Sequence, residues 1–378
     1  MKIEVLKENL KTNLNITERI VGKNLSLPIL NNVLITTDNN FLSLVSTDLE
    51  IAIKLWILVK IIKNGNIVVP AKFLSAFISS LPNEKITMEV KDQNLYIECK
   101  NIKTQIQGYS SEDFPIIPEF KNAEYIELDS KKLCMGLAQI IDIASTSQSR
   151  PEISGVYFSF SKNAIKMVAT DSFRLGEKNI HLEEPLKNIK EKDYSFILPQ
   201  KSAREVMNIL ENKEGLMRIY FSSNQVLFEL PMKEAAHPQV QITSRLIEGE
   251  YPNYQDIIPT KFKTHVVLKK DEFLNQIKTA SLFSGKVNEV KISINKEKQE
   301  IEVFAKSGDV GENRSSLPVK VEGDSIDVSF NYKYLIDGLL NIKSSEIIFD
   351  ISKEEGPCIL KPVGDSSYIY VVMPIKSM

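Results

Sequence analysis

The fold is decided by a phrase that occurs three times, as VLKENLKTNL (5–14), IELDSKKLCMGL (126–137) and VLKKDEFLNQI (267–277). Each copy is a short apolar strand that passes through a polar turn into an amphipathic helix. Two other phrases recur in the same order, FLSLVSTDLE (41–50) with IKMVATDSFR (165–174) and IEVFAKSGDV (301–310), and IVVPAKFLSAFI (67–78) with FILPQKSAREVMNIL (196–210) and VSFNYKYLIDGLL (328–340). A repeat of roughly 125 residues is a whole domain and not a solenoid unit.

The repeats predict three similar domains, at residues 1–124, 125–259 and 260–378. Within each domain a strand passes into a helix twice, which predicts helices at 5–21, 70–80, 130–146, 199–213, 269–286 and 331–343. Alternating apolar runs between them, such as 86–90 and 290–294, predict antiparallel strands. The expected class is α+β, with each domain a duplicated unit of helix and antiparallel sheet.

Composition indicates an ordinary globular protein of 378 residues, with 43% hydrophobic and 25% charged residues and a net charge of −2. Its three cysteines form no CxxC pair, and we expect a reducing, cytoplasmic location. No signal peptide is expected, because residues 1–8 are charged and strand-like. The most apolar stretch, residues 51–62, contains Lys54 and Lys60 and is too short to cross a bilayer. The sequence offers no reason for its apolar character.

The predicted helices contain nearly twice as many basic as acidic residues, whereas the remaining segments are acidic. Two interpretations are open. Lysine is a good helix former, so these faces are solvated surface. Alternatively, a basic face repeated in three domains attracts phosphates without reading sequence.

A search for catalytic chemistry finds little. No nucleotide-binding or hydrolase motif is complete, and His181, His237 and His265 are isolated, so no metal site or cofactor is expected. Asp48 and Asp171 each follow a threonine at the end of a strand. Two carboxylates can do acid–base work, but equivalent positions in successive domains favour a Thr-Asp turn that caps the strand.

Nine short motifs occur in a characteristic order: LPIL (27–30), STDLE (46–50), VPAK (69–72), DFP (113–115), VATD (168–171), RL (174–175), YPNY (251–254), FN (330–331) and YVVMP (370–374). Over its whole length the chain resembles the bacterial DNA polymerase III beta subunit family, the replicative sliding clamps. The resemblance implies a DNA clamp fold in which two chains form a head-to-tail homodimer, a ring around duplex DNA. It implies no enzymatic activity. Such a ring tethers the replicative polymerase for processive synthesis and also binds the clamp loader, other polymerases and repair proteins, but no membrane.

The resemblance also implies sites. Partner peptides would enter a cleft between the second and third domains formed by Ile153, Thr170, Phe173, Arg174, Leu175, Pro252, Ile257, Asn331, Tyr334, Val371, Met373, Pro374 and Ile375. For Leu175, Val371 and Met373 the alternative is ordinary core. DNA would face Lys23, Asn24, Lys72, Gln148, Arg150 and Lys201, each of which is otherwise a solvated surface residue. Ring closure would join Ile106 of one chain to Leu282 and Phe283 of the other.

Two residues depart from the family pattern. Phe173 stands where many relatives have histidine, and Asp256 where an arginine is common. Peptide preference is therefore not fixed by the resemblance. Two functional alternatives remain beside the ring: a monomeric three-domain adaptor that binds peptides but not DNA, and a hydrolase that uses Asp48 or Asp171.

Overall fold

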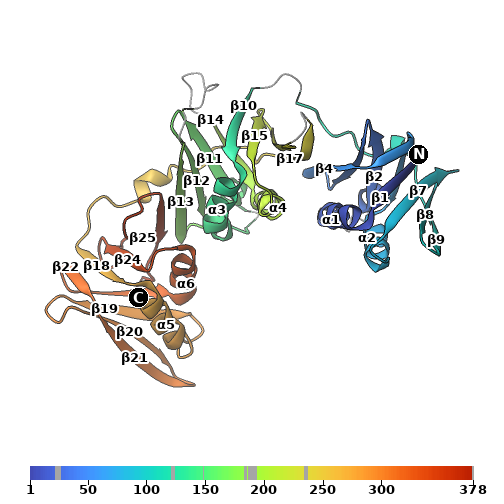
Figure 1. The fold of residues 1–378 in the computed structure, drawn as a ribbon. Coiled ribbons are helices and arrows are strands. Elements are labelled where there is room, and N and C mark those ends of the chain that lie inside the picture. The colour runs from blue at the N-terminus through green and yellow to red at the C-terminus, as the bar shows by residue number, and fades with distance from the viewer. Residues whose placement is uncertain are drawn as a thin grey trace. The chain divides into compact units, whose positions relative to one another are not determined.

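A computed structural model describes residues 1–378 except 22–26, 121–123, 148, 183–184, 186–193, 234–236 and 377–378. The chain forms two compact units (Figure 1). The first unit comprises Met1–Cys134 and Glu205–Leu246, and the second comprises Met135–Arg204 and Ile247–Met378. This division into two units does not test the domain boundaries at 124 and 259, which stay a prediction.

The first unit contains two antiparallel sheets. The five-stranded sheet has, in spatial order, β5 (Lys60–Lys63), β1 (Lys2–Leu6), β7 (Lys85–Lys91), β8 (Asn94–Cys99) and β9 (Ile102–Gln107). The eight-stranded sheet has β10 (Tyr125–Asp129), β15 (Leu216–Phe221), β16 (Gln225–Pro231), β17 (Pro238–Arg245), β4 (Ile51–Leu58), β3 (Phe41–Thr47), β2 (Asn32–Asp38) and β6 (Asn66–Pro70). Helices α1 (Lys7–Thr17) and α2 (Ala71–Ser80) pack against each other and against these strands.

The second unit repeats this arrangement. Its nine-stranded sheet has β14 (Tyr194–Pro199), β11 (Gly155–Ser161), β12 (Ala164–Thr170), β13 (Arg174–His181), β26 (Tyr368–Val372), β25 (Cys358–Pro362), β24 (Glu346–Ile351), β18 (Thr264–Lys269) and β22 (Lys320–Gly323). Its four-stranded sheet has β21 (Gly311–Pro318), β20 (Glu300–Ser307), β19 (Glu289–Asn295) and β23 (Ile326–Asn331). Helices α5 (Lys270–Ser281) and α6 (Tyr332–Asn341) pack together as α1 and α2 do.

Helices α3 (Ser130–Ile140) and α4 (Gln200–Leu210) have residues in both units. Short 3-10 helices lie at Pro28–Asn31 (η1), Ser111–Asp113 (η2), Ile141–Ile143 (η3), Pro151–Ile153 (η4) and Tyr254–Ile257 (η5). All six predicted helices are present, but each is shorter than predicted. The first residues of several predicted helices belong to the preceding strand, as Val5 and Leu6 belong to β1. The α+β class and the antiparallel sheets are confirmed.

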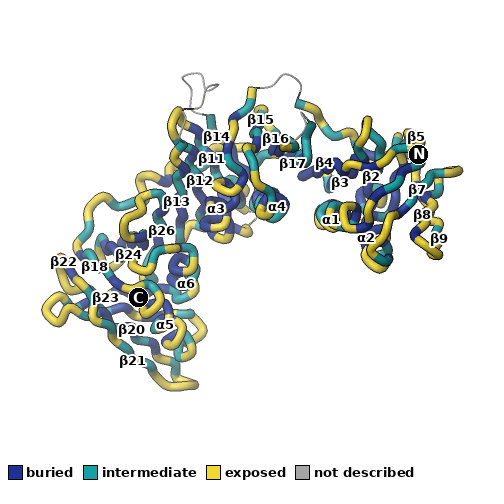
Figure 2. The backbone as a smooth tube through the Cα atoms, viewed as in Figure 1, coloured by how far each residue is buried: buried dark blue, intermediate teal, exposed yellow. Residues whose placement is uncertain are grey.

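The part of the apolar run at 51–62 that forms β4 now has an explanation. Strand β4 is buried on both faces along most of its length, as Figure 2 shows for the interior of its sheet. Helix α1 packs against it, and the segment 117–120 lies over its other face, opposite Ala52 and Trp56. A strand covered on both faces is continuously apolar instead of alternating.

Each unit joins strands of two different repeats in one sheet. We call the junction of β4 with β17 the first seam, and the junction of β13 with β26 the second seam. Both seams are antiparallel ladders, so each large sheet continues without interruption from one repeat into the next.

Candidate functional site

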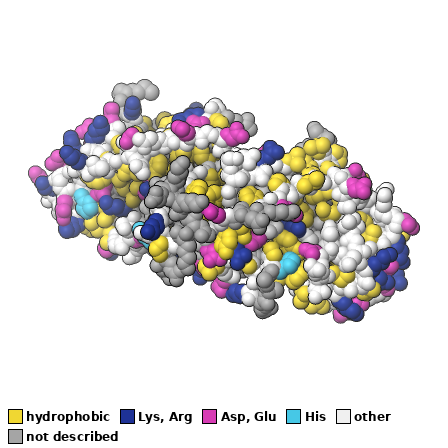
Figure 3. Space-filling view, turned by 90° about the horizontal axis from the view of Figure 1, so that it is seen from above, with side chains coloured by type: hydrophobic (Ala, Val, Ile, Leu, Met, Phe, Trp, Pro, Cys, Tyr) yellow, Lys and Arg dark blue, Asp and Glu magenta, His cyan; other side chains and the backbone are white. Residues whose placement is uncertain are grey.

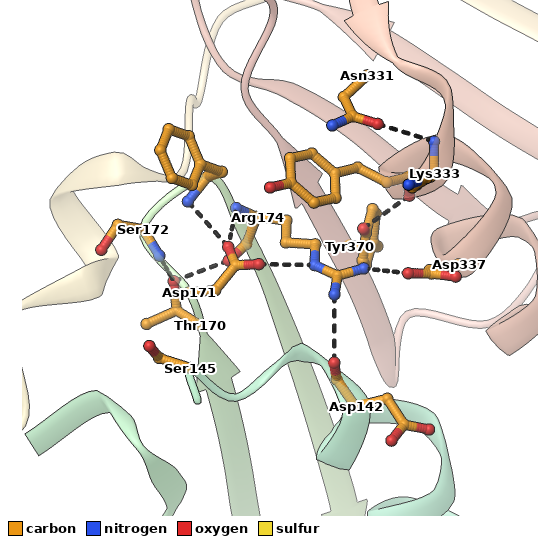
Figure 4. Close-up of polar contacts among 12 residues, drawn as sticks. Asp142, Ser145, Thr170, Asp171, Ser172, Arg174, Asn331, Lys333, Asp337 and Tyr370 are labelled. Atoms are coloured by element: carbon orange, nitrogen blue, oxygen red, sulfur yellow. Dashed lines mark hydrogen bonds and ion pairs between the residues drawn. The ribbon is translucent and has the colours of Figure 1, made fainter. Parts of the chain in front are cut away.

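A tight turn after β12 shapes one edge of the second seam (Figure 4). Asp171 Oδ1 accepts hydrogen bonds from the backbone N–H groups of Phe173 (2.9 Å) and Arg174 (3.0 Å). The Thr170 hydroxyl donates to the Arg174 carbonyl (2.7 Å) and accepts from Ser172 N–H (3.1 Å). Ser172 adopts a left-handed φ of 78°. The turn presents Phe173 to solvent, with 59% of its surface exposed.

Arg174 lies at the centre of the site. Its Nε donates to Asp171 Oδ2 (2.9 Å), one terminal nitrogen pairs with Asp337, and the other donates to the Asp142 carbonyl (3.2 Å). Figure 4 shows Asp171 and Asp337 on opposite sides of the guanidinium. The guanidinium also lies over the Tyr334 ring, at 4.8 Å. A single side chain therefore connects the turn, the 3-10 helix η3 and helix α6.

The surroundings of Arg174 favour its protonated, positively charged form. Burial alone disfavours it, but Tyr370, Asp337 and Asp171 lie against the guanidinium and raise its pKa. Burial and the Asp171 carboxylate raise the pKa of Tyr334. With two carboxylates on it, Arg174 leaves no net positive charge to attract an acidic ligand.

The second seam continues past β26 into the C-terminal segment. Leu175 faces Val371 in the ladder, Met373 N–H donates to the Phe173 carbonyl (2.8 Å), and Ile375 N–H donates to the Ser329 carbonyl (2.8 Å). Gln139 on α3 reaches across to the Asn341 carbonyl at the end of α6 (2.8 Å). The seam is thus fixed both by strand pairing and by helix contacts.

The segment that carries η5 covers one face of this ladder. Tyr254 and Ile258 pack in a cluster with Leu175 and Val371. Tyr254 donates its hydroxyl to the buried Glu177 carboxylate (2.7 Å), and burial followed by Glu177 raises the Tyr254 pKa. The neighbouring Ile257 is 48% exposed.

The structure brings the predicted cleft residues together around the second seam, at three levels of burial. Ile153, Leu175 and Val371 are buried. Phe173 and Ile257 are exposed. The half-buried members are Thr170, Arg174, Pro252, Asn331, Tyr334, Met373, Pro374 and Ile375. An exposed apolar rim over a buried apolar floor is a surface suited to an apolar peptide anchor.

Sequence reasoning missed Asp142, Asp337 and Tyr370, which hold Arg174 and Tyr334 in place. One signal was present. Asp337 follows Tyr334 by three residues in a helix, so both lie on the same face of α6. The fixed position of Asn331 was also not foreseen: its side chain caps α6 by accepting from Lys333 N–H (3.0 Å).

The predicted DNA-facing residues are only partly placed. Lys72 on α2 and Lys201 on α4 are exposed. Arg150 is engaged at the second seam, where it donates to Glu152 (3.0 Å) and the Ser172 hydroxyl (3.0 Å). Lys23, Asn24 and Gln148 lie outside the described residues. On the face drawn in Figure 3, basic and acidic side chains are interspersed.

The predicted closure residues lie near sheet edges. Strand β9 ends one sheet and β21 ends another, so each has one side without a strand partner in its sheet. Ile106 on β9 is packed in the core of its own sheet, whereas Leu282 is 72% exposed after α5 and Phe283 is half-buried. An unpaired edge strand is a template for pairing with another chain.

The two aspartates considered for catalysis are both turn residues. Asp48 Oδ1 accepts from Glu50 N–H (3.0 Å) and Ile51 N–H (2.9 Å), as Asp171 does in its own turn. Within the described ranges, no cluster of three His, Cys, Asp or Glu side chains is arranged to hold a metal ion. No helix in the described part of the chain is long and apolar enough to cross a membrane.

The comparisons with known proteins cover the entire chain. It matches the DNA polymerase III beta subunit in three segments, the N-terminal domain over 1–118, the central domain over 127–253 and the C-terminal domain over 255–376. Proteins named beta sliding clamp from Staphylococcus aureus and Bacillus subtilis are 29% and 27% identical over 389 residues, with 100% of each chain covered.

Solved structures agree. The DNA polymerase sliding clamp of Bacillus subtilis is 26% identical with a TM-score of 0.93, and the DNA polymerase beta subunit of Streptococcus pyogenes is 26% identical with a TM-score of 0.92. Both alignments cover 100% of both chains.

Proposed function

The chain belongs to the DNA polymerase III beta subunit family, and from this premise we propose that it is a replicative sliding clamp. Two chains form a ring around duplex DNA and tether the replicative polymerase. The observation that carries this conclusion is the match to beta sliding clamps from end to end, in sequence and in fold. The ring is a processivity factor and not an enzyme. We place it in the cytoplasm, where replication proteins of this family act.

Ring closure follows from the sheet edges. A head-to-tail contact between β9 of one chain and β21 of the next would pair these two edge strands with each other. Such a heterologous contact closes after two chains only if each chain turns the assembly by half a circle. We assign Ile106, Leu282 and Phe283 to this contact, with Ile106 supporting β9 from inside its own core. The alternative of a monomeric adaptor is not retained, because the relatives that match the whole chain are named as clamps.

DNA is held without sequence readout. The helices carry the excess of basic residues, and contacts with phosphates are screened and sequence-independent. Weak contacts permit sliding, while the closed circle prevents escape, so the polymerase stays at high effective concentration near the primer end. We assign Lys72, Arg150 and Lys201 to the DNA-facing surface, together with Lys23, Asn24 and Gln148.

Partner peptides bind at the second seam. The exposed Phe173 and Ile257 and the half-buried Met373 supply apolar contact, and the saturated Arg174 fixes the shape of the surface instead of supplying charge. We expect Leu175→Ala with Met373→Ala to weaken binding of a clamp-binding peptide while the dimer persists. Unchanged peptide affinity would place the site elsewhere.

Retention on DNA tests the ring itself. The protein is loaded on nicked circular DNA by its clamp loader, and the DNA is then cut once. The closed ring is expected to slide off the linear ends, whereas it stays on uncut circles in the control. Protein that remains bound after cutting, at a salt concentration that removes it from linear DNA added directly, would contradict topological retention.

A further inference from the structure

The two seams share one register. In the first seam Ala52 of β4 faces Thr243 of β17. In the second seam Leu175 of β13 faces Val371 of β26. These pairs are equivalent, because Ala52 and Leu175 each also face the threonine of the preceding Thr-Asp turn. A register that occurs at both junctions between repeats predicts the register of any further junction of the same kind.

Strand β21 is the counterpart of β4 and β13 in the third repeat. Thr47 faces Ala52 in the first repeat, and Lys306 faces Glu312 at the equivalent place in the third. The turn between the two strands is one residue longer in the third repeat. Counted along the strand, Glu312 is therefore the counterpart of Ala52 and Leu175. In the described part of the chain, no strand pairs with the far side of β21.

Strand β9 is likewise the counterpart of β17. The last residue before α1 faces Lys85, and the last residue before α3 faces Leu216. Four residues after these come Glu89 and Tyr220, each of which begins a row of facing residues that crosses its sheet. The rows are Glu89–Tyr96–Gln105 in the first repeat and Tyr220–Leu227–Thr243 in the second. Gln105 therefore holds the place of Thr243.

We propose that ring closure forms a third ladder in this same register, in which Glu312 of one chain lies opposite the partner's Gln105. We call it the closure ladder. It rests on the ring proposed above and specifies which residues of the two edge strands meet. The occupant of each edge is a second copy of this chain, because β21 and β9 are the two halves of a junction that the chain forms twice within itself.

The two edges fit each other in the closure ladder. Exposed Glu312 lies opposite exposed Gln105, and half-buried Asn313 lies opposite half-buried Thr104. The side-chain oxygen of Asn313 is buried and accepts no hydrogen bond from the described residues. The hydroxyl of the partner's Thr104 is a donor at this position. A shift of one residue would place exposed side chains opposite half-buried ones.

The next pair along the closure ladder consists of two cations, Lys103 and Arg314. Each already has a glutamate of its own chain, Glu98 at 3.1 Å from Lys103 and Glu302 at 2.8 Å from Arg314. The row across the closure is therefore acid, base, base, acid, without net charge. Because the row is exposed to solvent, the two cations repel each other only weakly.

The same register brings two exposed apolar side chains together. At the second seam Phe173 and Tyr334 stack with ring centroids 6.3 Å apart. Val310 holds the place of Phe173, two residues before the facing residue of its strand. Phe73 holds the place of Tyr334, since each is the third residue of its helix. Val310 is 65% exposed and Phe73 is 58% exposed. The closure places Val310 against the partner's Phe73 and covers both.

Cross-linking tests the register. Gln105→Cys and Glu312→Cys are introduced together in the full chain, whose native cysteines are buried. Facing residues of an antiparallel pair lie about 5.5 Å apart at Cα, which a disulfide can span. We expect mild oxidation to give a covalent dimer on a non-reducing gel. The matched control is Gln105→Cys with Arg314→Cys, a diagonal pair about 7–8 Å apart, which is expected to give little dimer.

The mass of the reduced variant in solution separates the register from the ring. A dimer that does not cross-link through Gln105→Cys and Glu312→Cys, or that cross-links better through Arg314→Cys, would overturn the register and leave the ring standing. A monomer at the same concentration would contradict the ring and the closure ladder together.

Dimer dissociation tests the apolar contact. Phe73→Ala is expected to raise the dimer dissociation constant about tenfold, and Val310→Ala about threefold, in sedimentation experiments. The double variant is expected to lose less than the product of the two factors, because the two side chains contact each other. Ile62→Ala is the control, since Ile62 is 51% exposed on β5 at the opposite edge of the same sheet. Effects that multiply would show that Phe73 and Val310 do not meet.

Discussion

The two seams are built on the same turn and the same ladder, yet they are held by different chemistry. In both, a threonine and an aspartate close the turn, a residue with φ near 78° follows, and the next carbonyl accepts from the opposite strand. The first seam has Leu49 at 77° and Glu50 O···Arg245 N at 2.9 Å; the second has Ser172 at 78° and Phe173 O···Met373 N at 2.8 Å. The backbone is thus repeated, and the two seams differ in their side chains.

The main difference lies at the residue after that carbonyl. In the first seam it is Ile51, which is 1% exposed and packs as core. In the second seam it is Arg174, which joins Asp171, Asp337 and Asp142. An apolar residue at this place closes the seam by burial alone, whereas an arginine makes the seam depend on a network of polar contacts.

The largest expected effect comes from removing that network. Arg174→Met leaves Asp171 and Asp337 facing each other without a cation, and we expect the second unit to lose about 3 kcal/mol of unfolding free energy. The matched change Ile51→Met conserves volume in the first seam and is expected to cost less than about 1.5 kcal/mol. Urea denaturation of both variants measures the difference. Equal losses would mean that the network contributes nothing beyond packing.

A smaller effect is expected where α6 crosses β26. A Cβ added to Gly338 would lie 2.5 Å from two ring carbons of the fully buried Tyr370. In the repeated phrase Val206 of α4 occupies the position that Gly338 occupies in α6. The second seam therefore has no side chain at this position of the helix and a large ring, Tyr370, on the strand. Gly338→Ala is expected to lower stability by about 2 kcal/mol through overpacking.

Thermal unfolding checks the Gly338 prediction, with Gly285→Ala as its control. No atom lies within 4 Å of a Cβ built at Gly285. The control is therefore expected to change stability by no more than about 0.5 kcal/mol. A Gly338→Ala variant as stable as the control would show that Tyr370 can move aside.

The segments that cover the two seams, residues 114–120 at the first and 251–258 at the second, differ in their hydroxyl groups. Tyr254 donates to buried Glu177, but the buried Tyr251 hydroxyl has no hydrogen-bond partner among the described residues. The first covering segment has Phe114 in the place of Tyr251. We expect Tyr254→Phe to cost about 1 kcal/mol and Tyr251→Phe to be neutral or slightly stabilising. Calorimetry on the two single variants measures this, and the reverse order would contradict the assignment of the bond.

Much of this comparison was accessible from sequence, but its decisive parts were not. Periodicity predicted all six helices, and the Thr-Asp pairs predicted capped turns, because both signals are local. The partners of Arg174 were missed, since Asp142 and Asp337 come from other segments and only the fold brings them together. The pairing of Ala52 with Thr243 was equally inaccessible, because this ladder joins strands of two different repeats. The Leu175 and Val371 side chains are buried, and their part in the peptide cleft stays a prediction.

The smallest expected effect on stability at neutral pH concerns two buried thiols, Cys134 in the first unit and Cys358 in the second. Each thiol reports on its own unit. Cys358 faces Val372 of β26 at the second seam, and burial raises its pKa to about 12. Cys134 belongs to the first unit, and burial, followed by Glu211 and Asp129, raises its pKa to about 12 as well. Both folded and unfolded thiols are neutral at pH 7, so neither affects stability there. Above pH 9 the unfolded thiol ionises while the folded one does not, and stability falls as the pH rises towards 12.

Alkylation follows the thiolate, so opening of a seam appears as a faster reaction of its own cysteine. We expect iodoacetamide to label Cys358 faster in Arg174→Met than in the unaltered protein, with Cys134 unchanged. Mass spectrometry of the peptides distinguishes the two sites, and Ile51→Met serves as the control in which Cys358 keeps its rate. Equal acceleration at both cysteines would mean that the loss of Arg174 loosens the whole chain, and that the polar network is not a local fastening of the second seam.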